Sequence, residues 1–131
     1  MKTILLSLLS VLFTSMSGCQ KETVSTELVG NWEWVSRTGG IAGVHQTPQT
    51  LGYTYTVVYT KDGIYEQYDK DNKLVVTYPY NIIKAVSMLD GKEHNMIQSN
   101  NAMNSSFEIR NDSLFLVQDV FDGFNEVYIR K

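Results

Sequence analysis

Few residues of this 131-residue chain could carry out chemistry. The chain has two histidines, His45 and His94, and one cysteine, Cys19, so a three-histidine metal centre and a multi-cysteine zinc site are both excluded. It contains no Gly-x-Ser-x-Gly sequence that would expose a nucleophilic serine. We therefore expect no catalytic residue, no cofactor and no enzymatic activity, with both histidines on the surface.

Two further patterns could bind ligands but are better explained as loops and turns. Gly39, Gly40 and Gly43 precede His45, yet no Lys-Ser/Thr pair follows them as it does in a phosphate-binding loop. The carboxylates Asp119, Asp122 and Glu126 could offer oxygen atoms to calcium, but their spacing does not match a calcium-binding loop. Asp and Gly are also the usual residues of hairpin turns. We predict a turn at 119–123 and no metal site.

Tyrosine is the residue type in clear surplus. The chain has eight tyrosines, at positions 53, 55, 59, 65, 68, 78, 80 and 128. A tyrosine combines a large apolar ring with a hydroxyl group that needs a partner when buried, so tyrosines can line a site for an amphipathic or planar ligand. The alternative is that they only reflect the aromatic preference of strands and cross-strand packing.

The single cysteine follows a segment that reads as a removable leader. Lys2 precedes an apolar run at 4–13, which is too short to span a bilayer and fits a secretory signal peptide. The run ends in Ser15-Met16-Ser17-Gly18-Cys19, which resembles a bacterial lipobox. The resemblance implies cleavage after residue 18 and lipid on Cys19; the alternatives are an unmodified cysteine or ordinary signal cleavage nearby.

Lipid on Cys19 would place the protein in the bacterial cell envelope, most simply on the outer membrane. Several acyl chains on one residue give stable anchoring. Residues 19–27 would then be a tether, and Gln20-Lys21-Glu22 within it resembles a surface-export signal of Bacteroidetes lipoproteins. The alternative for these three residues is a plain solvated tether. The net charge of −3, without a basic cluster, argues against binding of nucleic acid.

The rest of the chain, 28–131, is predicted to be one all-β domain. Alternating apolar residues and turn signals such as Asp62-Gly63 mark short strands, and Pro79 marks an edge, bulge or bend. We predict eight strands, at 28–37, 53–60, 64–69, 74–83, 96–98, 106–110, 113–118 and 124–130. Their short sequential connections favour an antiparallel up-and-down barrel over a sandwich, and closing a barrel removes unpaired edges.

Gly30-Asn31-Trp32 in the first strand resembles the opening Gly-x-Trp motif of the lipocalins. That resemblance implies an eight-stranded barrel in which Trp32 closes one end and Arg130, from the last strand, packs over its ring. The middle of the chain, from Trp32-Glu33-Trp34 through Gly39-Gly40-Ile41-Ala42-Gly43 to Lys61-Asp62-Gly63, resembles the lipocalin-like lipoproteins of Bacteroidetes, as the lipobox does. The alternative is that Trp32 is an ordinary core tryptophan of a half-buried strand.

Alternation along the strands predicts which side chains face the barrel interior. Besides the two tryptophans, we expect Tyr53, Tyr55, Val57, Tyr59, Val76, Tyr78, Tyr80, Leu114 and Leu116 to face inward. Tyr55, Tyr78, Tyr80 and Leu116 are the candidates for binding a small hydrophobic or amphipathic ligand.

Three classes of function follow from this architecture. The first is a monomeric, non-enzymatic binding lipoprotein that holds a small hydrophobic or amphipathic molecule. The second is a surface-displayed β module that contacts a protein or glycan through its loops, and an enzyme of unfamiliar type is third. A cavity in the barrel would favour the first, and a filled interior would favour the second.

Overall fold

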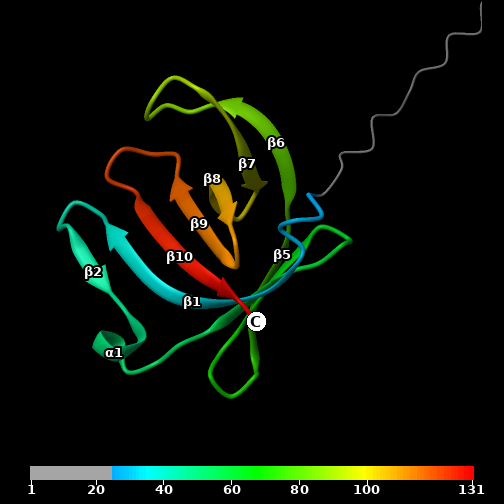
Figure 1. Cartoon of the computed structure of the whole chain (residues 1–131), viewed down its shortest axis with the longest axis vertical. Helices are drawn as coiled ribbons and strands as arrows, with labels where there is room; N and C mark the ends of the chain where they lie inside the picture. Colours follow the sequence, from blue (N-terminus) through cyan, green and yellow to red (C-terminus); the bar gives the residue numbers. More distant parts are fainter. Residues whose placement is uncertain (1–24) are drawn as a thin grey trace, which may run out of the picture.

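The computed structural model describes residues 25–131 (Figure 1). The predicted signal peptide at 1–18, the lipid site at Cys19 and most of the tether lie outside the described residues. Within residues 25–131, no helix has the length and apolar character needed to cross a membrane.

The described chain is almost entirely β-structure, with one short helix, α1 (Pro48–Leu51). The ten strands are β1 (Gly30–Gly39), β2 (Val44–Gln46), β3 (Thr56–Tyr59), β4 (Ile64–Tyr68), β5 (Leu74–Pro79), β6 (Asn81–Val86), β7 (Glu93–Ser99), β8 (Ala102–Arg110), β9 (Ser113–Gln118) and β10 (Phe124–Arg130).

The strands form one antiparallel sheet that curls into a nearly closed barrel. The order across the sheet is β5-β4-β3-β1-β10-β9-β8-β7-β6. Neighbouring strands in the sheet are therefore also close in the sequence, except for β1 and β10, the first and last strands. Figure 1 shows β1, β10, β9 and β8 side by side in the wall of this barrel. The predicted all-β, up-and-down barrel is confirmed.

The predicted number of strands, eight, is wrong because one predicted strand is divided and another was missed. The run 74–83 breaks at Tyr80 into β5, which pairs with β4, and β6, which pairs with β7. Pro79 ends β5, as the bend predicted there requires, and the Tyr80 N–H donates instead to the Gly63 carbonyl at 2.8 Å. Within residues 25–131, β5 and β6 make no ladder with each other.

The segment 39–52, where no strand is predicted, contains the strand β2 and the helix α1. β2 pairs with the end of β1, where His45 lies opposite Thr38. The helix begins at a capping box in which Thr47 and Thr50 bond each other's backbone, and it ends at Gly52 in the left-handed conformation. Three-residue strands and single helical turns are too short to give a periodic signal.

The core of the barrel consists of large inward-facing side chains. The core cluster comprises Leu28, Trp32, Trp34, Val57, Tyr59, Tyr65, Tyr80, Ile97, Leu114, Leu116 and Tyr128. Tyr53 and Val76, which the alternation placed inside, are 51% and 39% exposed, so both predictions are wrong. Tyr53 precedes β3, and Val76 lies where β5 has a register shift against β4, so neither is held against the core.

Candidate functional site

One end of the barrel is covered by Arg130 and Trp32, which are register partners in β10 and β1. The guanidinium carbon of Arg130 lies 4.1 Å from the centroid of the Trp32 ring. The Trp32 indole N–H donates to the Leu28 carbonyl at 2.8 Å. Arg130 donates from Nη1 to the Val29 carbonyl and from Nη2 to the Glu27 carbonyl, at 3.2 and 2.7 Å. These bonds hold residues 27–29, which precede β1, across this end of the barrel.

Gly30 lies beside Arg130 at this end of the barrel. Its backbone has a φ of +148°, a conformation that L side chains rarely adopt. A Cβ atom at this position would lie 2.7 Å from Arg130 Nη1. The structure therefore brings together all three residues of the Gly-x-Trp and arginine pattern.

Two of the predicted ligand residues lie in the packed half of the interior. Tyr80 is 2% exposed, packs edge-on against Tyr59 and donates its hydroxyl to the Thr60 carbonyl at 3.0 Å. Leu116 is buried in the core cluster. Tyr78, the third, is half-buried and stacks on Tyr65 with the ring centroids 4.5 Å apart. Neighbouring rings occupy this region, so these three residues contribute to packing.

Tyr55, the fourth predicted ligand residue, has a different environment. Its ring stacks on Trp34 with a centroid distance of 5.2 Å and an interplanar angle of 13°. Its hydroxyl lies 3.5 Å from the Tyr128 hydroxyl, which donates to Glu126 Oε2 at 2.7 Å. Burial, together with the nearby Glu126 carboxylate, raises the pKa of Tyr55 to about 12.

A charged pair completes this polar chain. Arg37 Nε donates to Glu126 Oε1 at 2.6 Å, while Tyr128 donates to Oε2, so each oxygen of the Glu126 carboxylate accepts one hydrogen bond. Glu126 is therefore engaged inside the barrel, whereas Asp119 binds Ser87 on a different hairpin. The structure does not bring Asp119, Asp122 and Glu126 together, and residues 25–131 contain no group of three potential metal ligands.

Tyr55 also borders a pocket of about 230 Å³, which we call the rim pocket. It opens where the segment before β3 faces the turn between β4 and β5. It is lined by Tyr53, Thr54, Tyr55, Gln67, Asp69, Lys70, Asp71 and Val75. Tyr53 and Val75 are about half exposed, so apolar side chains border the entrance. Apart from Tyr55, the sequence alone did not single out these residues as a site, because they come from separate turns.

One buried polar group near this pocket lacks a partner. Trp34, against which Tyr55 stacks, is 2% exposed, and its indole Nε1 has no hydrogen-bond acceptor among the described residues. An unpaired buried N–H is uncommon and requires an explanation, such as a bound water or ligand.

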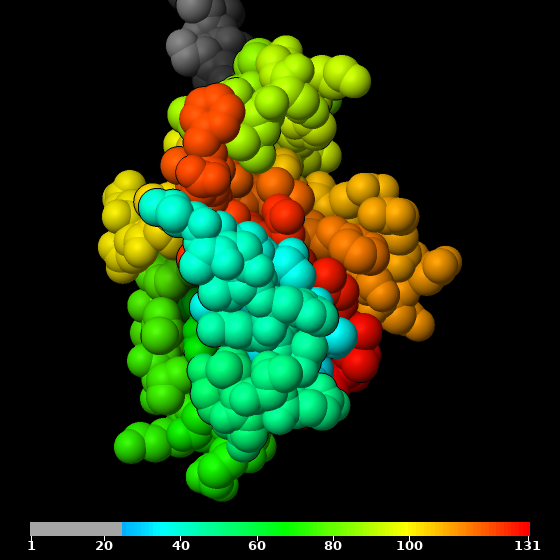
Figure 2. Space-filling model, turned by 90° about the vertical axis from the view of Figure 1, so that its left-hand side faces the viewer, coloured from blue at the N-terminus to red at the C-terminus, as the bar shows by residue number. Residues whose placement is uncertain are grey.

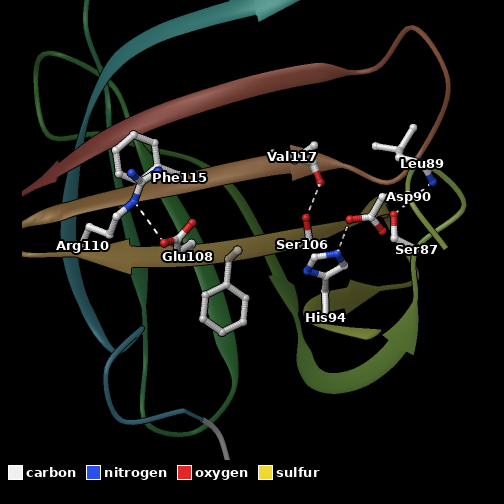
Figure 3. Close-up of a pocket in the computed structure, with 10 residues that line it drawn as sticks. Ser87, Leu89, Asp90, His94, Ser106, Glu108, Arg110, Phe115 and Val117 are labelled. Carbon is white, nitrogen blue, oxygen red and sulfur yellow. Dashed lines mark hydrogen bonds and ion pairs between the residues drawn. The ribbon is translucent and has the colours of Figure 1, made fainter. Parts of the chain in front are cut away.

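His94 lies on the outside of the barrel, where Nε2 is 2.8 Å from the Asp90 carboxylate (Figure 3). His45 lies on β2 and does not line the pocket to which His94 and Asp90 belong.

Comparison with known proteins does not place this chain in a family: no family model matches it, and neither a curated protein nor a solved structure matches significantly. The resemblance to lipocalins that Gly30, Trp32 and Arg130 suggest in the sequence therefore stays a prediction.

Proposed function

We propose that this protein is a non-enzymatic binding protein that holds a small, planar, amphipathic molecule in the rim pocket. The observation that carries the proposal is the position of Tyr55, which borders the pocket and stacks on Trp34. A tyrosine ring fixed in this way offers a flat apolar surface that is already ordered before a ligand binds.

The chemistry of the pocket supports a ligand with one apolar and one polar side. Tyr53 and Val75 supply apolar surface at the entrance, while Gln67 and the turn at 69–71 supply polar groups.

The size of the pocket limits the ligand. About 230 Å³ is below the roughly 300–1,000 Å³ of pockets that hold drug-sized molecules. The neighbouring interior is occupied by the rings of Tyr59, Tyr65, Tyr78 and Tyr80. A compact aromatic molecule therefore fits better than a long-chain fatty acid.

Titration of the purified protein with 8-anilinonaphthalene-1-sulfonate and with palmitate tests this proposal. We expect the small fluorophore to bind and to quench Trp34, and palmitate to bind at least about tenfold more weakly. Tyr55→Ala and Val75→Glu should each weaken binding of the fluorophore about tenfold, the effect of losing roughly 1.4 kcal/mol. Tyr80→Phe, a change in the packed half, is the matched control and should leave binding unchanged. Equal binding by Tyr55→Ala, or no binding of either molecule, would overturn the proposal.

We also propose that lipid on Cys19 anchors the protein in the cell envelope. The supporting feature is the lipobox-like sequence that ends at the only cysteine of the chain. Labelling of cells with palmitate should mark the wild-type protein and not Cys19→Ser, which should also leave the membrane fraction. Equal labelling of the two proteins would contradict the anchor. Protease shaving of intact cells then tests surface display through Lys21 and Glu22.

A second candidate function, a module that binds another macromolecule through its loops, has its own supporting observation. Met88 and Phe121 are 55% and 70% exposed at the tips of two hairpins. Ser87 and Asp119 join these hairpins by a hydrogen bond of 2.6 Å. Figure 2 shows the β9–β10 turn beside the β6–β7 hairpin at the top of the molecule. Failure of the whole titration panel, with a folded protein, would favour this module.

A further inference from the structure

A second concave surface lies on the outside of the barrel, apart from the rim pocket. It is a groove of about 340 Å³ between the β6–β7 hairpin and the strands β8 and β9 (Figure 3). Leu114 and Leu116 face the core, so the alternate residues of β9, Phe115 and Val117, face outward into the groove. We call this surface the outer groove.

The outer groove exists because the β6–β7 hairpin is fastened to the end of β9. Asp119 accepts the Ser87 hydroxyl at 2.6 Å and the Met88 N–H at 3.1 Å. Ser87 is only 5% exposed. Met96, which lies two residues after His94 and on the same face of β7, is 1% exposed. This hairpin is therefore packed in place, and the shape of the groove is built into the fold.

Each end of the outer groove carries one acid and one base. At one end Arg110 lies 3.1 Å from Glu108 and 4.3 Å above the centroid of the Phe115 ring. At the other end His94 and Asp90 are 2.8 Å apart, and Figure 3 shows the two pairs separated by Ser106. Backbone N–H donation from Lys92, followed by His94, holds the pKa of Asp90 below its usual range.

The hydrogen-bonding groups in the groove are available to a ligand. The side chains of Glu108 and Arg110 are 63% and 61% exposed, and exposed ion pairs contribute little stability, so a ligand can replace one partner at low cost. The Ser106 hydroxyl lies 3.5 Å from the Val117 carbonyl, at the long limit for a hydrogen bond. Its hydroxyl is thus nearly free between the two ion pairs.

Because acidic and basic side chains lie together at both ends of the groove, a ligand of either charge would meet a side chain of the same charge. An anion at either end would meet Glu108 or Asp90, and a cation would meet Arg110. A wholly apolar molecule would remove water from both ion pairs without replacing its hydrogen bonds. Hydroxyl groups both donate and accept, so they can bond a carboxylate and a neighbouring guanidinium or imidazole together.

We propose that the outer groove binds a neutral, polyhydroxylated ring of the size of a monosaccharide. Its hydroxyls bond the Glu108–Arg110 and Asp90–His94 pairs, and its C–H face lies against the apolar side chains of Val117 and Leu89. Arg110 already covers one face of the Phe115 ring. This site does not depend on the proposed function, because the two pockets share no residue.

Saturation-transfer NMR of the purified full chain with methyl glycosides of glucose, galactose, mannose and N-acetylglucosamine tests the site. We expect saturation transfer to at least one glycoside. The dissociation constant of that glycoside should be about tenfold larger for Glu108→Gln and for Asp90→Asn than for the wild type, because each variant loses one charge-assisted hydrogen bond. Glu66→Gln, an equivalent change on the outer face of β4, is the control and should leave the constant unchanged.

Three results would overturn the proposal. These are no transfer to any glycoside from the folded protein, equal binding by Glu108→Gln and Asp90→Asn, and binding of inorganic phosphate in preference to every glycoside. Val75→Glu, which alters the rim pocket, should leave glycoside binding unchanged, so failure of the rim pocket and failure of the outer groove are separate outcomes.

Discussion

Arg130 lies face-on to Trp32, 4.1 Å from the ring centroid, and connects the last strand of the barrel to the first. The two residues are 98 positions apart in the chain but directly opposite each other in the β1–β10 ladder. This contact, with the bonds of Arg130 to Val29 and Glu27, covers one end of the barrel where the first and last strands lie side by side.

Trp32→Ala should lower the free energy of unfolding by about 3–5 kcal/mol, because the ring is fully buried in the core. Arg130→Ala should cost less, about 1–2 kcal/mol, for the lost cation–π contact. Chemical denaturation measures both. Trp32→Phe, which keeps a ring, should cost less than Trp32→Ala, and a stability of Trp32→Ala equal to that of the wild type would contradict the role of this contact.

Gly30→Ala should destabilise the protein by about 1–3 kcal/mol, because it places a side chain in a strained backbone conformation and against Arg130. In a double-mutant cycle, Arg130→Ala should relieve part of the cost by removing the contact with Nη1. Gly91→Ala has a positive φ but nothing within 4 Å, so it serves as the control for backbone strain alone. Strict additivity of Gly30→Ala and Arg130→Ala would show that no such contact exists.

The stability of the protein should fall as the pH rises from 10 to 12. Burial raises the pKa of Tyr55 and of Tyr80 from 10.0 to about 12. The folded protein therefore binds more protons than the unfolded chain in this range, so the stabilisation is complete below pH 10 and is lost as the pH passes 12. Absorbance at 295 nm should show these tyrosines ionising together with unfolding. Tyr55→Phe should make the loss of stability less steep, and full ionisation below pH 11 in a folded protein would contradict the prediction.

Asp119→Ala should loosen the β6–β7 hairpin and lower the free energy of unfolding by about 1–3 kcal/mol, because the buried Ser87 hydroxyl loses its acceptor. Hydrogen exchange should show faster exchange of the Met88 N–H, which also donates to Asp119. Asp112→Ala, an exposed turn residue, is the control. Unchanged exchange at Met88 would show that the bond does not hold the hairpin.

Turns and strands with local signals were predictable from the sequence. Gly63 has a positive φ in the turn predicted at Asp62-Gly63, and Asp122 has one in the turn predicted at 119–123. The predicted strands 113–118 and 124–130 agree with β9 and β10 at both ends. In contrast, no strand is predicted between 98 and 106, but β8 begins at Ala102, because residues there pair with β7. Its pairing, and not its hydrophobicity, makes that segment a strand.

By itself the sequence determined the antiparallel barrel and its turns, because alternation and turn chemistry are encoded over a few residues. The contact between Trp32 and Arg130, 98 positions apart, was expected only from the resemblance to lipocalins. Only the tertiary structure decided where the concave surfaces lie. Tyr53 and Tyr55 are two residues apart on an apparently common face, yet one is half exposed while the other stacks on Trp34. The outer groove depends on a bond between Ser87 and Asp119, 32 residues apart. Such contacts are fixed by how the sheet curls and closes, and no local pattern records that geometry.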